Sequence, residues 1–395
     1  MGSPFEAFAM GGNFVSVIYL DNCATMPCRR EIAEAMTAYF CEEFGNPSSQ
    51  HILGKKAKHA VNGALAKVAR FIGAEPDEIV LTSGATESNN LAIFGVFDVH
   101  EKSPVNAVFC PTDHKSSLDA AKELNRRGID IRYVDVLRNG RICLDSLERL
   151  LDEHTRLVSI ACVNSEIGTI QQVEKIARLC ADNRVICHMD AVQAAGRIEL
   201  NVKDLGIGAL SLSAHKIYGP KGVGALYVEA SVSKRMRPLL FGGGQNRLRS
   251  GTLPTPLIVG LGMACEMTEE ELQENYEATE RVRDYFIHVL SQQVDEFILT
   301  TDCVSVPHIL NVQFPGVSSE TLVTGLREVA VSSGSACNSD SLEPSYVLTA
   351  IGLTEEQANS SIRFCLHPDL SYEDVERAVS KIAQKIYSMK CLSTM

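Results

Sequence analysis

The feature that most constrains the fold is an alternation of short apolar runs with longer segments of helical periodicity. Seven runs read as strands, at residues 78–82, 107–110, 131–134, 157–162, 185–189, 209–213 and 224–228. Helical segments lie between them, at residues 88–97, 117–126, 144–151, 173–181 and 202–205. Because strands that alternate with helices form parallel sheets covered by helices, the pattern predicts an α/β fold with a mostly parallel seven-stranded sheet.

The character of the chain changes after about residue 265. Residues 266–292 are charged at helical spacing and predict one long helix, followed by a strand at 309–314 and helices at 320–328 and 373–387. We therefore expect a large domain at 26–265 and a smaller α+β domain formed by 1–25 with 266–395. No GxGxxG motif follows the early strands, which argues against a dinucleotide-binding domain in the first 150 residues.

Composition narrows the class of function. A net charge of −12 in 395 residues disfavours direct nucleic-acid binding, although it says nothing of local patches. The 13 cysteines form no CxxC pair and no Cys/His array, so we expect neither a metal site nor a disulfide framework. Free thiols in this number indicate a reducing compartment, and no secretory signal or membrane span is evident. The expectation is a soluble cytoplasmic protein.

A lysine and an aspartate follow consecutive strand candidates. Lys216 stands in the run SLSAHKIYGPKG, just after the strand at 209–213, and Asp190 closes the strand at 185–189. Ligands bind at such strand ends in open α/β sheets, where desolvation readies a lysine for a Schiff base. A buried aspartate needs a cationic partner, and the pyridinium nitrogen of a pyridoxal cofactor is one. Gln193 is placed to contact the phenolic oxygen of such a cofactor. Each residue also has an ordinary interpretation, as a solvated lysine or a helix-capping aspartate.

Two further segments suit phosphate. In TSGATESNN, Gly84 permits a sharp turn, and the backbone amides of Ala85 and Thr86 then lie at a helix N-terminus, which is a ready anion site. The same letters also describe a plain helix cap. The run GGGQNRLRSGT at 242–252 is a second Gly-rich loop that offers hydroxyl and arginine side chains.

The C-terminal third contains a candidate nucleophile. Cys337 lies among small polar residues in VSSGSACNSDSLEPS, where we expect it to be exposed, a precondition for thiolate reactivity. Downstream, Arg363 lies on a strand in SSIRF, and its planar guanidinium suits a bidentate hold on a substrate carboxylate. Taken alone, Arg363 also fits a surface salt bridge.

Together these stretches resemble the cysteine desulfurases, which are fold type I (class V aminotransferase) pyridoxal phosphate enzymes. The similarity runs nearly end to end, from IYLDNCAT at 18–25 through FGNPSSQH at 44–51 to the SAC loop and its LEPSY tail. The resemblance implies removal of sulfur from L-cysteine, giving L-alanine and a persulfide on Cys337. That sulfur would pass to an acceptor protein in iron–sulfur cluster assembly, thiolation or DNA sulfur modification. It also implies a homodimer.

The resemblance assigns roles residue by residue. Lys216 would hold the cofactor as a Schiff base, with Asp190 at the pyridine nitrogen and Gln193 at the ring oxygen. His114 would stack on the ring, and either it or the Lys216 amine would remove the substrate's Cα proton. The implied phosphate contacts are Ala85, Thr86, Ser213, His215 and, from a partner subunit, Thr252. Arg363 and Asn164 would contact the substrate, and Ser165 the cofactor.

The sequence departs from the family pattern at a few positions. Ser165 stands where an asparagine is usual, the Gly-rich loop is about one residue short, and Cys23 and Met26 replace commoner residues in the opening motif. Two alternatives therefore stay open. One is a selenocysteine lyase or another class V enzyme such as an aminotransferase. The other is a catalytically idle scaffold that docks sulfur-transfer partners.

Overall fold

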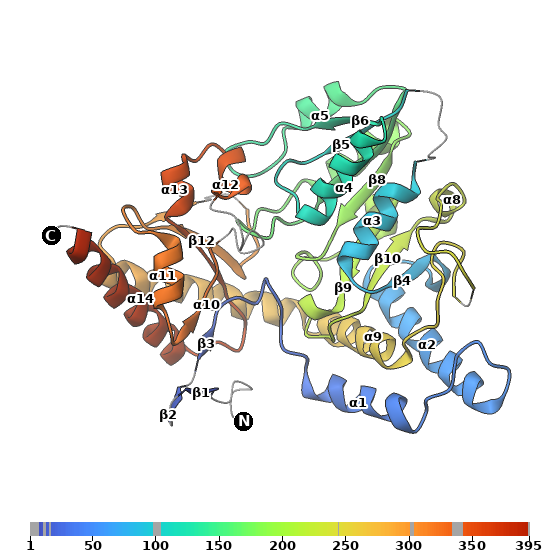
Figure 1. Cartoon of the computed structure of the whole chain (residues 1–395), viewed down its shortest axis with the longest axis horizontal. Helices are drawn as coiled ribbons and strands as arrows, with labels where there is room; N and C mark the ends of the chain where they lie inside the picture. The colour runs from blue at the N-terminus through green and yellow to red at the C-terminus, as the bar shows by residue number, and fades with distance from the viewer. Residues whose placement is uncertain are drawn as a thin grey trace.

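The computed structural model describes residues 8–10, 13–15, 17–97, 104–243, 245–300, 304–333 and 343–393. Its main sheet has seven strands in the order β4-β10-β9-β8-β7-β5-β6 (Figure 1). Strand β10 is antiparallel to both of its neighbours, and the other pairs are parallel. The predicted α/β fold with a mostly parallel seven-stranded sheet is confirmed. The strands are β4 (Ile79–Thr82), β5 (Asn106–Phe109), β6 (Asp130–Tyr133), β7 (Thr155–Ala161), β8 (Ile186–Asp190), β9 (Ala209–Ser213) and β10 (Gly224–Val228).

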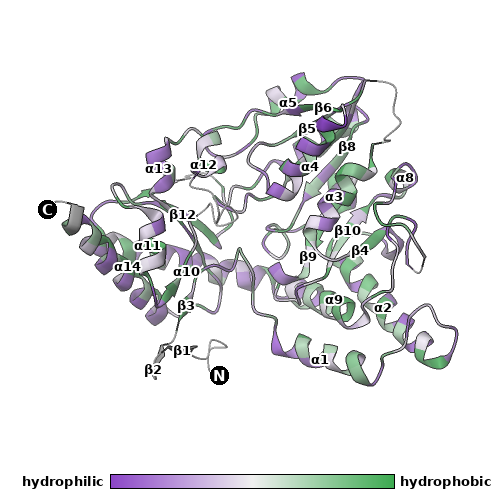
Figure 2. Ribbon diagram, viewed as in Figure 1, coloured by the Kyte–Doolittle hydropathy of each residue, from purple (hydrophilic) through white to green (hydrophobic). Residues whose placement is uncertain are grey.

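Helices cover both faces of this sheet. Neighbouring residues of one strand belong to different apolar clusters: Val108 packs with one and Phe109 with the other. The cluster of Phe109 includes side chains of α3 (Ala85–Gly95) and α4 (Lys115–Arg126), and the cluster of Val108 includes side chains of α2 (Ile52–Phe71), α6 (Val173–Asp182) and α9 (Thr255–Glu270). Side chains alternate between faces along a strand, so a sheet buried on both sides needs near-continuous apolar runs. Figure 2 shows β9 and β10 as largely hydrophobic.

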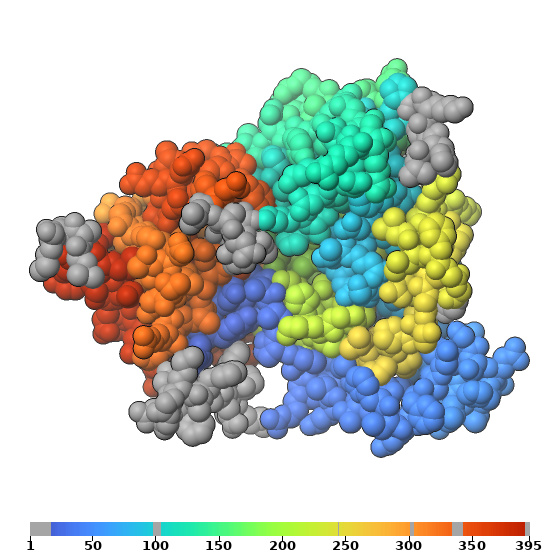
Figure 3. All heavy atoms as spheres, in the orientation of Figure 1, coloured from blue at the N-terminus to red at the C-terminus, as the bar shows by residue number. Residues whose placement is uncertain are grey.

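A third apolar cluster lies apart from this sheet. It joins Ile18 and Leu20 to side chains of α10 (Leu272–Gln293), β12 (Ile309–Gln313) and α14 (Tyr372–Ser393). Strands β11 (Ile298–Leu299), β12 and β14 (Ser361–Cys365) form an antiparallel sheet there, while β13 (Val329–Ala330) pairs in parallel with β3 (Ile18–Tyr19). Figure 3 shows the dark-blue N-terminal segment between the two parts. The predicted division at 25/26 and 265/266 remains a proposal.

The helix predicted at 266–292 is wrong in its extent. The chain forms α9 up to Glu270 and α10 from Leu272, with Glu271 between them at φ −100° and ψ 2°. The carboxylate of Glu271 pairs with Arg29, an interaction between residues far apart in sequence that helical spacing cannot reveal.

The remaining α-helices and β-strands are β1 (Phe8–Met10), β2 (Asn13–Val15), α1 (Arg30–Cys41), α5 (Leu144–Leu150), α7 (Val202–Leu205), α8 (Ala230–Ser233), α11 (Ser319–Gly325), α12 (Tyr346–Ala350) and α13 (Glu355–Asn359). No helix of the described segments is both long and apolar enough to cross a membrane.

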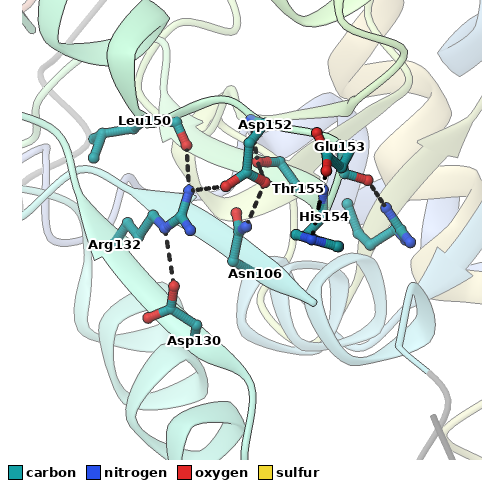
Figure 4. A network of polar contacts seen from close by, with 9 residues as sticks. Asn106, Asp130, Arg132, Leu150, Asp152, Glu153, His154 and Thr155 are labelled. Atoms are coloured by element: carbon teal, nitrogen blue, oxygen red, sulfur yellow. Dashed lines mark hydrogen bonds and ion pairs between the residues drawn. The ribbon is translucent and has the colours of Figure 1, made fainter. Parts of the chain in front are cut away.

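A polar network ties the β5–β6–β7 edge of the sheet together (Figure 4). The carboxylate of Asp152 accepts hydrogen bonds from Arg132 at 2.7 Å, Asn106 at 2.8 Å and the backbone N–H of His154 at 2.9 Å. Burial raises the pKa of Asp152, but these donors outweigh it and hold the pKa well below its ordinary value. Because Asn106 is buried, loss of this acceptor would leave its amide without a partner in the network.

Candidate active site

A cavity of about 600 Å³ lies at the carboxyl ends of β4, β5, β7, β8 and β9. This is the edge at which open α/β sheets bind ligands. Most of the predicted site residues line it together: Ala85, Thr86, His114, Asn164, Ser165, Asp190, Gln193, Ser213, His215, Lys216 and Arg363.

Lys216 reaches the cavity from a short 3₁₀ turn at Ala214–Lys216 that follows β9. The chain then bends sharply, with Tyr218 at φ 60°, a left-handed conformation that is uncommon for a residue with a side chain. A Cβ on the next residue, Gly219, would lie 2.9 Å from Ala214, so the turn requires glycine there. The amine donates to the carbonyl oxygens of Cys23 and, at 2.7 Å, of Ala24, which anchors its position.

Asp190 is the last residue of β8 and is 8% exposed. One oxygen, Oδ1, accepts the backbone N–H of Val192 at 3.0 Å, and Oδ2 accepts the amide of Asn89 at 2.7 Å. Within the described part of the chain, Asp190 forms no ion pair, although it lines the cavity. A buried carboxylate in that setting gains from a cationic ligand.

The turn before α3 brings backbone donors to the cavity. Gly84 has φ 148°, and the N–H groups of Ala85 and Thr86 belong to the first helical turn, where no intrahelical acceptor exists. Strand β10 passes close behind: a Cβ at Gly224 would lie 2.8 Å from Gly84 Cα. Because glycine occupies both positions, the strand and the turn can approach each other at this point.

Ser213 and His215 extend the same cradle. Ser213 is 3% exposed, and His215 Nδ1 lies 3.1 Å from Thr25 Oγ1. Burial and the charge of Lys216 lower the pKa of His215 to about 4, so the ring is neutral at pH 7 and carries one N–H. Helix-terminal amides, hydroxyls and a neutral imidazole form a donor set suited to phosphate.

Arg363 enters the cavity from β14, in the other part of the molecule. Its guanidinium donates to Asp21 Oδ1 at 2.8 Å and to the carbonyl oxygen of Ser165 at 3.0 Å. The side chain is only 9% exposed, which excludes the simple surface salt bridge. A guanidinium fork has five N–H donors, so these two bonds leave capacity for a carboxylate.

Asn164 also lines the cavity, but its amide groups hold the surrounding loop. Nδ2 donates to Thr112 O at 2.8 Å, and Oδ1 accepts the backbone N–H groups of Glu166 and Ile167 at 2.9 and 3.1 Å. These contacts favour a structural role, and its substrate contact stays a prediction. Ser165 uses its backbone oxygen to hold Arg363, a contact that its side chain could not reveal.

Gln193 is buried and is oriented by the N-terminal segment. Its amide nitrogen donates to Cys23 O at 3.0 Å, and its oxygen lies 3.4 Å from His308 Nε2. A primary amide carries two N–H groups, so the second N–H of Gln193 can serve a ligand in the cavity. Cys23 thus acts here through its backbone carbonyl, which anchors Lys216 as well.

Two predicted residues lie outside this arrangement. Thr252 is exposed and does not line the cavity, so its phosphate contact from a partner subunit stays a prediction. Cys337 lies outside the described residues. Conversely, sequence reasoning missed Asn89 and Ser116, which connect Asp190 to His114. The sequence could have indicated Asn89, because it is a polar residue one turn into the helix that follows the turn at Gly84.

Comparison with known proteins agrees with this geometry. The family model for aminotransferase class-V matches residues 18–378. The chain belongs to the class-V aminotransferase family. It is 42% identical, over 97% of its length and 94% of the relative's, to cysteine desulfurase IscS of Rickettsia rickettsii (strain Iowa).

Solved structures show the same fold. A NifS-like protein superposes with a TM-score of 0.88 at 35% identity, covering 94% of this chain and all of the other. A structure described as SspA in complex with cysteine matches with a TM-score of 0.81 at 37% identity, covering 89% of this chain and 99% of that one. Enzymes of this family depend on pyridoxal phosphate, and this chain is identified as one of them.

The residues of the cavity fit that cofactor. The buried carboxylate of Asp190, which forms no ion pair within the described residues, suits a pyridinium N–H, and the amine of Lys216 suits covalent attachment of an aldehyde. The donors around α3 and β9 suit its phosphate.

Proposed function

We propose that this chain is a cysteine desulfurase that converts L-cysteine to L-alanine and leaves the sulfur as a persulfide on Cys337. The observation that carries the proposal is one cavity that combines Lys216, the buried carboxylate of Asp190 and the guanidinium of Arg363. Its 42% identity to a cysteine desulfurase over nearly the full chain points to the same substrate.

Different residues of the cavity are suited to different parts of the cofactor. Pyridoxal phosphate, when bound, supplies an electron sink that weakens bonds at the substrate's Cα and Cβ. Lys216 would hold it covalently, Asp190 would keep its ring nitrogen protonated, and Gln193 would donate to its phenolic oxygen. Its phosphate would be held by Ala85, Thr86, Ser213 and His215, all of which line the cavity.

Arg363 orients the amino acid by its carboxylate. The guanidinium is fixed between Asp21 and Ser165 O, so little conformational entropy is lost when it binds substrate. Binding of the carboxylate by Arg363 directs the substrate's amino group toward Lys216 and favours α-amino acids over simple amines.

The sulfur step needs only the substrate and one thiol. The Cβ–S bond of L-cysteine breaks while an S–S bond forms to the Cys337 sulfur. The electron pair left at Cβ takes a proton, which completes the methyl group of alanine. No external oxidant is needed, because the products, alanine and a persulfide, together contain the atoms of cysteine and one thiol.

The test compares the wild-type protein with Lys216→Ala and Cys337→Ala. Wild-type protein should bind pyridoxal phosphate with visible absorbance and release alanine from L-cysteine. Lys216→Ala should lose the absorbance of the covalently held cofactor, and Cys337→Ala should keep it but lose persulfide. Wild-type protein that binds the cofactor and leaves L-cysteine unchanged would contradict the proposal. Activity confined to selenocysteine would favour a lyase instead, and absence of all turnover would favour a scaffold.

The proposal includes a homodimer. Large apolar side chains are exposed shortly before α2, at its first residue and just before the Gly-rich loop: Phe44 at 64%, Ile52 at 68% and Phe241 at 83%. Such surface is costly in water unless a partner covers it. Thr252 lies in the adjoining loop, from which it would reach a second subunit's phosphate site. A stable, fully active monomer in analytical ultracentrifugation would overturn this part.

Persulfide chemistry needs an acceptor protein. The relative's name, IscS, points to iron–sulfur cluster assembly, and thiolation and DNA sulfur modification start from the same persulfide. We further propose a cytoplasmic location, where the thiol would stay reduced. Radioactive sulfur passed from L-cysteine to a purified iron–sulfur scaffold protein tests the first route, and transfer only to a thiolation carrier would redirect it.

A further inference from the structure

A chain of side-chain hydrogen bonds runs from Asp190 to His114 through two residues that the proposed function leaves unused. The amide nitrogen of Asn89 donates to Asp190 Oδ2 at 2.7 Å and to Ser116 Oγ at 2.9 Å. Ser116 Oγ lies 2.8 Å from His114 Nδ1. Asn89, in the middle of this series of hydrogen bonds, is fully buried. The residues at the two ends of the series, Asp190 and His114, line the cavity.

The donors in this chain have one consistent direction. Both N–H groups of the Asn89 amide are used, one on Asp190 and one on Ser116. The Ser116 hydroxyl accepts that bond, so its own hydrogen is directed to His114 Nδ1. The backbone N–H of Ser116 points to the same nitrogen at 3.1 Å, because His114 caps α4. Two donors on Nδ1 make it an acceptor, and the proton of the neutral ring is therefore on Nε2.

We propose that Asn89 and Ser116 are positioning residues that hold His114 as its Nε2–H tautomer, so that His114 donates a hydrogen bond and does not take up the substrate's Cα proton. The inference rests on the proposed function. It decides between the two candidate bases that the sequence leaves open, and assigns proton uptake to the Lys216 amine in the same cavity.

The two ring nitrogens of His114 explain the assignment. A base needs a nitrogen with a free lone pair, yet Nδ1 uses its lone pair on Ser116, and Nε2 uses its own to carry the proton. Protonation of Nδ1 would set its N–H against the backbone N–H of Ser116. Hydrogen bonds in a connected series strengthen one another, so the link through Asn89 to Asp190 adds to the preference for the Nε2–H tautomer of His114.

Proton exchange at Cα separates the two candidate bases. Holoenzyme incubated with L-alanine in deuterated water should incorporate deuterium at Cα. His114→Ala should keep this exchange while its desulfurase rate falls but stays measurable, and Lys216→Ala should lose the exchange. Loss of exchange in His114→Ala, with exchange kept in Lys216→Ala, would overturn the inference.

The role of Ser116 needs its own variants. Ser116→Ala removes one neutral hydrogen bond and should lower the desulfurase rate about three- to tenfold, and Ser116→Thr should restore it. Asn89→Ala should act in the same direction and also shift the cofactor's absorbance, since it removes a donor to Asp190. Asn90→Ala is the matched control, because the Asn90 side chain donates to the backbone oxygens of Thr86 and Ser116 and not to the Ser116 hydroxyl.

A double variant tests whether Ser116 acts through His114. Added to His114→Ala, the Ser116→Ala change should have no further effect on rate or absorbance. The same loss in both backgrounds would overturn the inference while leaving the proposed function intact. Wild-type holoenzyme that exchanges no Cα proton and releases no alanine would overturn both.

Discussion

Replacing Arg363 by lysine gives a sharp test of how the substrate is held. The guanidinium is 9% exposed and bonded to Asp21 Oδ1 at 2.8 Å and to Ser165 O at 3.0 Å. Lysine keeps a positive charge beside Asp21, so the change does not strand a buried carboxylate. It does lose the planar fork, because an ammonium group binds a carboxylate as a point charge.

The magnitude follows from the number of bonds lost. A fork gives the substrate carboxylate two charge-assisted hydrogen bonds, and lysine gives one. The missing bond is worth about 1.5–3 kcal/mol, which corresponds to about 10- to 160-fold weaker binding of L-cysteine. If Arg363 orients the carboxylate, KM should rise more than kcat falls.

The assay measures binding through the absorbance of the bound cofactor, with L-cysteine and with cysteamine. Cysteamine lacks the carboxylate, so its affinity should be the same for wild type and Arg363→Lys within about twofold. Equal weakening of both ligands would refute the reasoning, because it would mean that the substitution damages the cavity as a whole.

Three further outcomes are expected. Asp152→Ala should lower the free energy of unfolding by about 2 kcal/mol in urea titrations, since it strands the buried Asn106 amide; an unchanged midpoint would contradict this. Burial raises the pKa of Glu166 from 4.5 to about 7, so its contribution to stability is present below pH 4.5 and lost as pH rises through about 7. Glu166→Gln should therefore flatten the decline of the melting temperature over that range, and a parallel decline would disprove it. Gly224→Ala should weaken pyridoxal phosphate binding, because its Cβ would lie 2.8 Å from Gly84 Cα; unchanged affinity in a dialysis assay would count against the proposed cradle.

Much of the fold was predictable because its strands are buried on both faces. Such strands require continuous apolar runs, and these stood out in the sequence for the buried strands such as β4, β5 and β8; the edge strand β6 is partly exposed. The helix break at Glu271 was not predictable, because the pairing of Glu271 with Arg29 depends on tertiary contact.

The site was predictable where residues follow strands, as Lys216 and Asp190 do. The parts that were missed depend on backbone atoms and on partners distant in sequence. Cys23 contributes its carbonyl oxygen to both Lys216 and Gln193, a role independent of its side chain. Asn89 reaches Asp190 from another element, so neither residue alone indicates the contact.

The most direct test of the central claim is the fate of the sulfur atom after one turnover with L-cysteine. Holoenzyme is mixed with substrate, quenched and digested, and its peptides are searched by mass spectrometry for an added sulfur. The account predicts one added sulfur on Cys337 for each alanine formed, and none in Lys216→Ala. Alanine formed without added sulfur on Cys337, or sulfur added at another cysteine, would contradict it.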